Sequence, residues 1–327
     1  MGARGRHGLL NTKTHFIMVD PRSSCPVCGN AQFNDFKLGL VQCGGCGLIL
    51  SPRIWQHEVN ELMEDEWFSD DYKADKSFWI NFFQDHNNKK TLARLKCRGG
   101  GLLEVGVGSG SFLNAARNAG FKVEGCDLSA SICRRVEKKY ALTVHCRPVA
   151  EIYGNERFDV VVLNHVLEHV QRPVDFLRDV ERLLVPGGLV HIAVPNVACW
   201  EAVLRGWTSY EPYHLTYFEA KTFKKTIELA GLSCNSVRTY DSFSGWFLAV
   251  LRTIMGVNKE YGAVTRPAGV ATRNTAIKRN PFIENAYRLL MTSVGGVITP
   301  FRRLQGWWGY GDELVCIARK PKHVDHK

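Results

Sequence analysis

Four of the eleven cysteines fall in two Cys-x-x-Cys-Gly motifs, at 25–29 and 43–47, with fourteen residues between the pairs. A Cys-x-x-Cys turn places two thiolates side by side, and structural zinc prefers four such ligands in a tetrahedron. The glycine after each pair permits the left-handed backbone that points amides at the sulfur atoms. A redox-active pair is the alternative, but it would not need to be duplicated. The spacing therefore predicts a structural zinc ribbon with the ligands Cys25, Cys28, Cys43 and Cys46.

A second pattern that could support chemistry is the run Glu-Val-Gly-Val-Gly-Ser-Gly at 104–110, which follows a short apolar segment. A glycine-rich turn between a strand and a helix opens the β-α-β unit of a nucleotide-cofactor fold. A dinucleotide fingerprint places its third glycine five residues after the first. Here position 111 is serine and the third glycine is Gly110, so the dinucleotide spacing does not match. A second apolar segment ends in the carboxylate of Asp127.

The Glu-x-Gly-x-Gly-x-Gly pattern resembles that of class I S-adenosylmethionine (SAM)-dependent methyltransferases. Residues 158–170 look like the fourth strand of that family with its loop, and 184–189 look like its Leu-x-Pro-Gly-Gly turn. The resemblance covers 98–239 and the final strand. It implies that SAM is the cofactor and that an acid after the second strand holds the ribose hydroxyls. The cofactor contacts that it implies are Glu104, Gly106, Gly108, Gly110, Asp127, Leu128 and Asn164.

Two histidines are candidates for catalysis. His214 lies in the segment 211–218, which resembles a His-Leu-x-Tyr-Phe signature of a branch found in cell-surface polysaccharide and natural-product sugar synthesis. The histidine of that signature has been assigned as a base in some members. C-methylating members carry an acid directly before it, where Tyr213 stands here, so we favour O-methylation over C-methylation. The alternative is that His214 only packs against Tyr217. The resemblance places the second candidate, His165, near the sulfonium.

The sequence His165-x-x-Glu168-His169 also matches an inverted zinc-protease motif. That motif needs both histidines on one helical turn, together with further ligands. Here the motif directly follows an apolar strand at the expected cofactor edge, and the methyltransferase interpretation also accounts for its neighbours. We therefore expect Glu168 and His169 to hold the loop and the adjoining helix.

Alternating strand and helix patterns position these residues. Such alternation predicts an α/β fold: a doubly wound, Rossmann-like methyltransferase sheet with an N-terminal zinc ribbon and a helical cap insertion. We expect a Pro-Gly-Gly turn at 186–188 to separate a helix from the fifth strand. The expected helices span 112–119, 174–184 and 218–230. The expected strands span 102–105, 122–126, 142–146, 158–163, 189–194, 233–239 and 313–319.

The domain organisation follows from these patterns. We expect a flexible tail over 1–20, the zinc ribbon over 21–52, a helical linker over 53–97, the methyltransferase core over 98–239, a basic helical cap insertion over 240–305 and the last core strand over 306–321. The insertion has a net charge of +6 and short apolar patches. Two interpretations of it stay open: a substrate lid, or a contact with an anionic partner such as a membrane surface.

The whole chain has 327 residues and a formal net charge of +10. No apolar run reaches the ~18 residues of a spanning helix, and no signal peptide is evident at the N-terminus, so we expect a cytoplasmic location, with peripheral contact at the inner membrane surface as an option. The predicted function is methyl transfer to a small or lipid-linked sugar-like substrate. Two alternatives are a methyltransferase for nucleic acid or ribosomes, and a zinc-ribbon interaction protein with a degenerate SAM site. We do not expect a nucleic-acid partner, because no Asn-Pro-Pro-Tyr-like motif follows the fourth strand.

Overall fold

The computed structural model describes residues 23–51, 78–95, 99–152, 154–207, 209–211, 213–240, 245–256, 293, 297 and 300–322. The expected tail over 1–20, most of the expected linker over 53–97 and much of the cap insertion lie outside the described residues.

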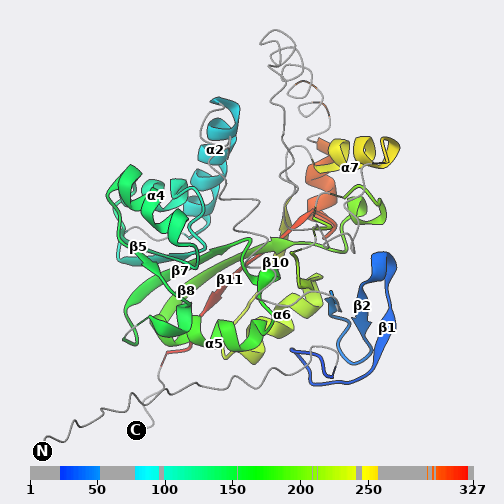
Figure 1. The fold of residues 1–327 in the computed structure, drawn as a ribbon, viewed down its shortest axis with the longest axis horizontal. Coiled ribbons are helices and arrows are strands. Elements are labelled where there is room, and N and C mark those ends of the chain that lie inside the picture. The colour runs from blue at the N-terminus through cyan, green and yellow to red at the C-terminus, as the bar shows by residue number, and fades with distance from the viewer. Residues whose placement is uncertain are drawn as a thin grey trace, which may run out of the picture.

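A seven-stranded sheet forms the centre of the molecule (Figure 1). All its strands run parallel except β11, which is antiparallel to both neighbours. The carboxyl ends of six strands therefore meet at one edge, where β11 begins. In order across the sheet the strands are β10 (Val237–Tyr240), β11 (Glu313–Arg319), β8 (Leu184–Pro195), β7 (Phe158–Asn164), β4 (Gly101–Val105), β5 (Lys122–Asp127) and β6 (Val144–Cys146).

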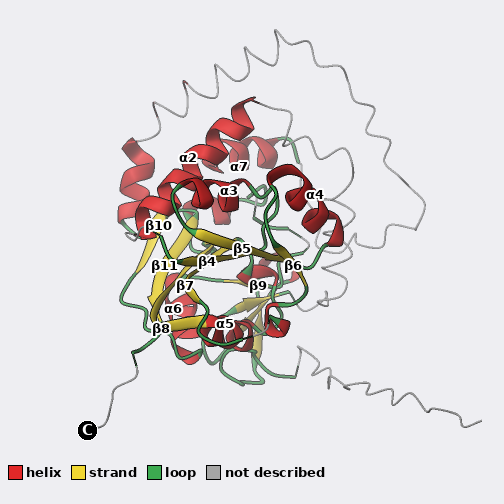
Figure 2. Cartoon of the chain, turned by 90° about the vertical axis from the view of Figure 1, so that its left-hand side faces the viewer, coloured by secondary structure: helices red, strands yellow, loops and turns green. Residues whose placement is uncertain are grey.

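Helices cover both faces of this sheet (Figure 2). Strand side chains alternate between the faces, so Leu102 and Val160 pack on one side while Leu103 and Val161 pack on the other. The first face is covered by α2 (Phe78–Leu95), α3 (Ser111–Asn118) and α4 (Ala130–Tyr140), and the second by α5 (Pro173–Leu183) and α6 (Ala220–Leu229). This arrangement confirms the predicted α/β sheet.

The N-terminal cysteine motifs belong to a second, four-stranded sheet. Its first three strands are β1 (Phe33–Asp35), β2 (Val41–Cys43) and β3 (Ile49–Leu50), and its fourth is β9 (Thr216–Tyr217), which comes from the middle of the chain. β3 pairs with β9 in antiparallel register, and the Ser51 amide donates to the Leu215 carbonyl at 3.0 Å. Leu48 of this small sheet also belongs to the hydrophobic core of the large one. The ribbon is therefore joined to the large sheet through the segment that contains His214.

Several expected boundaries need correction. The Pro-Gly-Gly turn at 186–188 does not separate helix from strand, because β8 starts at Leu184 and contains it as an irregularity. Phe158 pairs with Leu184 and Val160 with Leu189, so the extra residues form a bulge between these two pairs. The third strand is shorter than expected, at Val144–Cys146, and α6 starts later than expected, at Ala220.

Most of the described part of the 240–305 insertion is helical, although Tyr240 still belongs to β10. It contains α7 (Gly245–Ile254) and helical residues at 293, 297 and 300–305, the last of which continue to 307. No helix among the described residues is long and apolar enough to cross a membrane.

Candidate functional site

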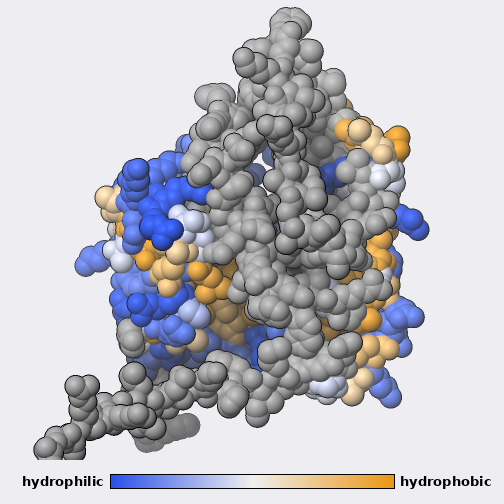
Figure 3. All heavy atoms as spheres, viewed as in Figure 1, coloured by the Kyte–Doolittle hydropathy of each residue, from blue (hydrophilic) through white to orange (hydrophobic). Residues whose placement is uncertain are grey.

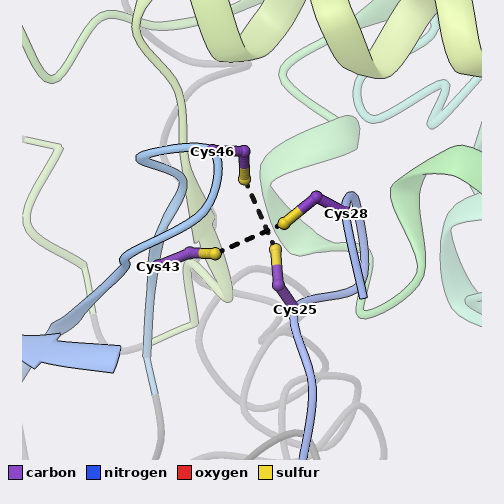
Figure 4. A group of neighbouring side chains, drawn as sticks. All are labelled: Cys25, Cys28, Cys43 and Cys46. Carbon is purple, nitrogen blue, oxygen red and sulfur yellow. Dashed lines mark hydrogen bonds between the residues drawn. The ribbon is translucent and has the colours of Figure 1, made fainter. Parts of the chain in front are cut away.

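The four cysteines of the ribbon converge on one point (Figure 4). The Sγ atoms of Cys25 and Cys46 are 3.6 Å apart, and those of Cys28 and Cys43 are 3.4 Å apart. Zinc–sulfur bonds of about 2.3 Å in a tetrahedron separate the sulfur atoms by about 3.8 Å. The thiol of Cys46 lowers the pKa of Cys25 to about 5. The donor set and its spacing fit a structural zinc ion.

The glycine loop connects β4 to α3 at the carboxyl edge of the large sheet, and its three glycines have different roles. All three have positive φ. A Cβ at Gly106 would meet Val166 at 2.6 Å, and one at Gly110 would meet Val136 of α4 at 2.7 Å, so both positions are needed for close packing. A Cβ at Gly108 would meet no atom within 4 Å. The loop therefore leaves open space beside Gly108, where a ligand can approach the backbone.

Two carboxylates flank this open space. Glu104 is the residue before the last in β4. It is 4 % exposed, and its Oε2 has no hydrogen-bond partner among the described residues. Burial raises the pKa of Glu104 well above its ordinary value. Asp127 is the last residue of β5. Burial raises the pKa of its carboxyl group, whereas hydrogen bonds from backbone amides, including that of Gly108, lower it. Its Oδ1 accepts a hydrogen bond from the Ser129 amide at 3.0 Å, and the next side chain, Leu128, is exposed. An unpartnered buried oxygen, a second carboxylate and an exposed apolar side chain are thus available to a ligand at this edge of the sheet.

His165 lies at the carboxyl end of β7, directly after Asn164. Its φ of +55° is in the left-handed region, which non-glycine residues rarely adopt outside turns and functional sites. Nδ1 is 3.3 Å from Glu168 Oε1, and Nε2 is 3.2 Å from Glu313 Oε1. Burial lowers the pKa of His165, but these two carboxylates outweigh it and hold the pKa well above its ordinary range. Both nitrogens of the half-exposed ring thus face carboxylates, which favour its protonated form.

Glu168, His169 and His214 form a buried group beside His165. Their potential ligand atoms all lie within 4.8 Å of one another. Both carboxylate oxygens of Glu168 are buried, and Oε1 faces His165 Nδ1. Among the described residues, the buried Nδ1 of His214 has no hydrogen-bond partner. His169 Nδ1 is 3.1 Å from the Tyr213 carbonyl, which fixes its ring. Burial lowers the pKa of His214 to about 3, so this imidazole is neutral near pH 7.

The protease interpretation of the same residues is not supported by this geometry. Leu167–His169 form a single 3₁₀ turn, and no longer helix is present there. His165 faces Glu168 and Glu313 and does not belong to the group of neighbouring ligand atoms formed by Glu168, His169 and His214.

The structure adds residues that the sequence did not indicate. Glu313 starts β11 and reaches His165 because that reversed strand begins at the edge where the parallel strands end. Arg94 of α2 lies 3.9 Å from Glu313 and stacks over the Tyr240 ring at 3.8 Å. The sequence did place Glu313 at the start of the last strand, but no local pattern indicates that it contacts His165 at the end of β7.

Comparison with known proteins agrees with this geometry. Residues 80–237 match the family described as "Methyltransferase domain". The ubiquinone biosynthesis O-methyltransferase of Bradyrhizobium diazoefficiens is 29% identical over 128 residues, which cover 37% of this chain and 47% of that one. A protein of Mycolicibacterium smegmatis, whose name describes an S-adenosylmethionine-dependent methyltransferase, is 26% identical over 180 residues, or 54% of this chain and 67% of that one.

The fold has a solved counterpart in the complex between the Haloferax volcanii Trm112 methyltransferase activator and a methyltransferase. One chain of that complex aligns with a TM-score of 0.50 and 16% identity, over 80% of this chain and 98% of that chain. The chain spans about half the length of the ubiquinone-related proteins that it matches. Residues 80–237 are thus similar to a methyltransferase domain, and the chain has the fold of one.

Proposed function

We propose that this protein transfers a methyl group from SAM to a small or lipid-linked sugar-like acceptor, with O-methylation favoured over C-methylation. The observation that carries the proposal is the meeting of two sets of groups at one edge of the sheet. The open glycine loop with Glu104 and Asp127 forms one set, and His165 with the buried Glu168–His214 pair forms the other.

The cofactor half of the site offers groups that suit the chemical parts of SAM. SAM, when bound, supplies an electrophilic methyl group on a sulfonium. Asp127 would accept hydrogen bonds from ribose hydroxyls, and the exposed Leu128 would pack against the adenine. Glu104 Oε2 lacks a hydrogen-bond partner among the described residues and would accept from the cofactor's ammonium group. Asn164, the last residue of β7, would close the site from that strand. Gly106 and Gly110 would let the loop pack closely enough for Gly108 to contact the ligand.

The acceptor half of the site contains two histidines. His165, whose ring nitrogens face Glu168 and Glu313, would position the acceptor through contact with its half-exposed ring. His214 is neutral, and in this proposal it takes the acceptor's proton or orients the acceptor through the cluster. The buried Glu168 carboxylate would stabilise the imidazolium that forms, as a carboxylate does for histidine bases in general. The ring contact between His214 and Tyr217, with centroids 5.8 Å apart, supports the competing packing role.

The proposal is tested by supplying methyl-labelled SAM to the purified protein with three separate acceptor pools. These are sugar nucleotides, a membrane extract of lipid-linked glycans, and total RNA with ribosomes. We expect label in one of the first two pools, where hydrolysis of the glycosidic bonds should release a labelled O-methyl sugar. Label in RNA or ribosomal protein would overturn the proposed acceptor class, and absence of SAM binding by calorimetry would favour an interaction protein with a degenerate site.

We also propose that the four-cysteine site holds one zinc ion. Elemental analysis of the purified protein should give about one zinc per chain. Cys43→Ser should lose the metal and lower the melting temperature, because a structural zinc site contributes directly to folding. Cys146→Ser, which changes an exposed cysteine outside the cluster, should keep both zinc and stability. A metal-free protein with unchanged melting temperature would contradict this assignment.

A further inference from the structure

One end of the described structure presents large apolar side chains to solvent. It is built from η5 (Trp200–Val203) and from helical residues 300–307 with the turn that follows them. Trp307 is 79 % exposed and Phe301 is 70 % exposed. The Trp200 ring lies 6.2 Å from the Trp308 ring and stacks on Tyr310 at 6.1 Å. We call this surface the aromatic face; its members are Trp200, Val203, Phe301, Leu304, Trp307, Trp308 and Tyr310.

The helix at 300–307 has its polarity reversed relative to a helix in water. Its inward side chains are Arg302 and Gln305, both at least 93 % buried, whereas Phe301 and Trp307 point outward. A surface helix normally buries its apolar stripe and exposes its charges. In this helix the polar side chains of Arg302 and Gln305 are buried and apolar side chains are exposed. Its outward side is therefore suited to a medium that is less polar than water.

Buried polar contacts hold the reversed helix in place. Gln305 Nε2 donates to Glu201 Oε2 at 2.7 Å, and Arg302 Nη2 lies 3.2 Å from the other oxygen of that fully buried carboxylate. Asn196 donates to the Gly311 carbonyl at 2.7 Å and fixes the chain beyond the helix. The aromatic face is therefore fixed in advance, and binding through it needs little ordering of side chains.

The charges around the aromatic face have one sign. Its segments, with the adjoining α7, span 200–207, 245–256 and 300–310, and within them Glu201 is the only acid. Since Glu201 is fully buried, the charges that reach the surface are those of Arg205, Arg252 and Arg303. α7 packs beside η5, because the Gly206 amide donates to Thr253 Oγ1 at 3.0 Å (Figure 1). Figure 3 shows apolar residues at the end of the molecule where α7 lies.

The aromatic face also adjoins the proposed active site. Tyr310 precedes Glu313 by three residues, and Glu313 contacts His165. On the other side, β10 ends at Tyr240, whose ring contacts Arg94 beside Glu313. An acceptor bound at His165 would thus lie close to whatever medium the aromatic face enters.

We propose that the aromatic face inserts into the interfacial layer of an anionic lipid bilayer and so brings a lipid-linked acceptor to the site. Tryptophan and tyrosine are favoured at that depth, because their rings are apolar and carry one polar group. Stable membrane attachment requires apolar insertion together with basic residues, and this surface offers both. The inference rests on the proposed function, and it narrows the proposed acceptor from a small or lipid-linked molecule to a lipid-linked one.

The test is co-sedimentation of the full chain with vesicles of phosphatidylcholine alone or with about one third phosphatidylglycerol. We expect binding to the anionic vesicles, weakening as salt rises, and blue-shifted tryptophan fluorescence that is quenched by lipid-attached quenchers. Trp307→Ser with Trp308→Ser should lower vesicle affinity at least tenfold. Leu229→Ser, at an apolar position of α6 that is also exposed, is the matched control and should bind normally.

Absence of binding at low salt would overturn the inference, as would binding that the double variant leaves unchanged. Self-association that the double variant abolishes, without vesicle binding, would identify a second copy as the occupant instead. SAM affinity of each variant is measured in parallel by calorimetry. A chain that binds vesicles but not SAM would contradict the proposed function while leaving the membrane contact intact, so the two failures are distinguishable.

Discussion

Asp127→Ala is expected to weaken SAM binding at least tenfold. The carboxylate lies at the end of β5, beside the open space at Gly108, where it would accept hydrogen bonds from two ribose hydroxyls. Hydrogen bonds to a charged group are worth about 1.5–3 kcal/mol, and tenfold in affinity corresponds to about 1.4 kcal/mol. Isothermal titration calorimetry with SAM and with its demethylated product measures the change.

Two comparisons separate ribose binding from a general loss of structure. Asp127→Asn keeps an acceptor oxygen for the Ser129 amide but removes the charge, and it should show an intermediate loss. Asp175→Ala removes an exposed carboxylate of α5 that pairs with Arg172 and Arg178, and SAM affinity should not change. An unchanged dissociation constant for Asp127→Ala, in a folded protein, would show that the ribose lies elsewhere.

His214→Ala is expected to retain SAM binding while turnover falls by roughly a hundredfold or more, the usual scale for losing a general base. The expectation follows from its place beside Glu168, whose buried carboxylate could stabilise a proton on the ring. His214→Phe is the decisive companion variant, because it keeps a ring against Tyr217 and removes both nitrogens. If the phenylalanine variant recovers the rate, His214 only packs. If turnover stays low with an unchanged SAM dissociation constant, the imidazole is needed.

The pH dependence gives an independent check on His214. Its pKa in the folded chain is about 3, below that of a histidine in water, so the unprotonated form persists as the pH falls from 8 to 6. The ratio of wild-type to His214→Phe turnover should therefore stay constant over that range. A ratio that declines with a midpoint near 6.5 would show that the ring titrates like an exposed histidine and would contradict the buried neutral state.

The positions of most strands were accessible from sequence because periodicity reports burial. The near-continuous apolar run at Phe158–Leu163 is buried except at Asp159. The final strand was expected over 313–319, as observed for β11. Local turn chemistry was less informative. The Pro-Gly-Gly sequence reads as a turn, but Gly187, with a φ of +81°, lies inside an irregular strand because pairing with β7 and β11 outweighs the local preference.

What could not be predicted depends on contacts between distant segments. The ribbon's fourth strand is only two residues long, Thr216–Tyr217, which is too short for any periodic signal. Glu313 meets His165 only because the last strand is reversed. At 300–307 the hydrophobic pattern would predict the wrong buried side of the helix, because the buried side chains are polar. Their partner, Glu201, lies about a hundred residues earlier in the chain. In each case the deciding interaction joins residues that no local pattern links.

The pairing of β3 with β9 has a consequence for synthesis of the chain. Ile49 leaves the ribosome long before Tyr217, the residue that it faces across the small sheet. At about 5–20 residues per second, the edge of the Ile49–Leu50 strand that faces β9 waits roughly 10–30 s without its partner, while β2 is already available on the other side. Metal captured by the first four cysteines during that interval would hold the nascent hairpin together. Zinc supply at the moment of translation would then govern the yield of folded protein, more than zinc supply afterwards.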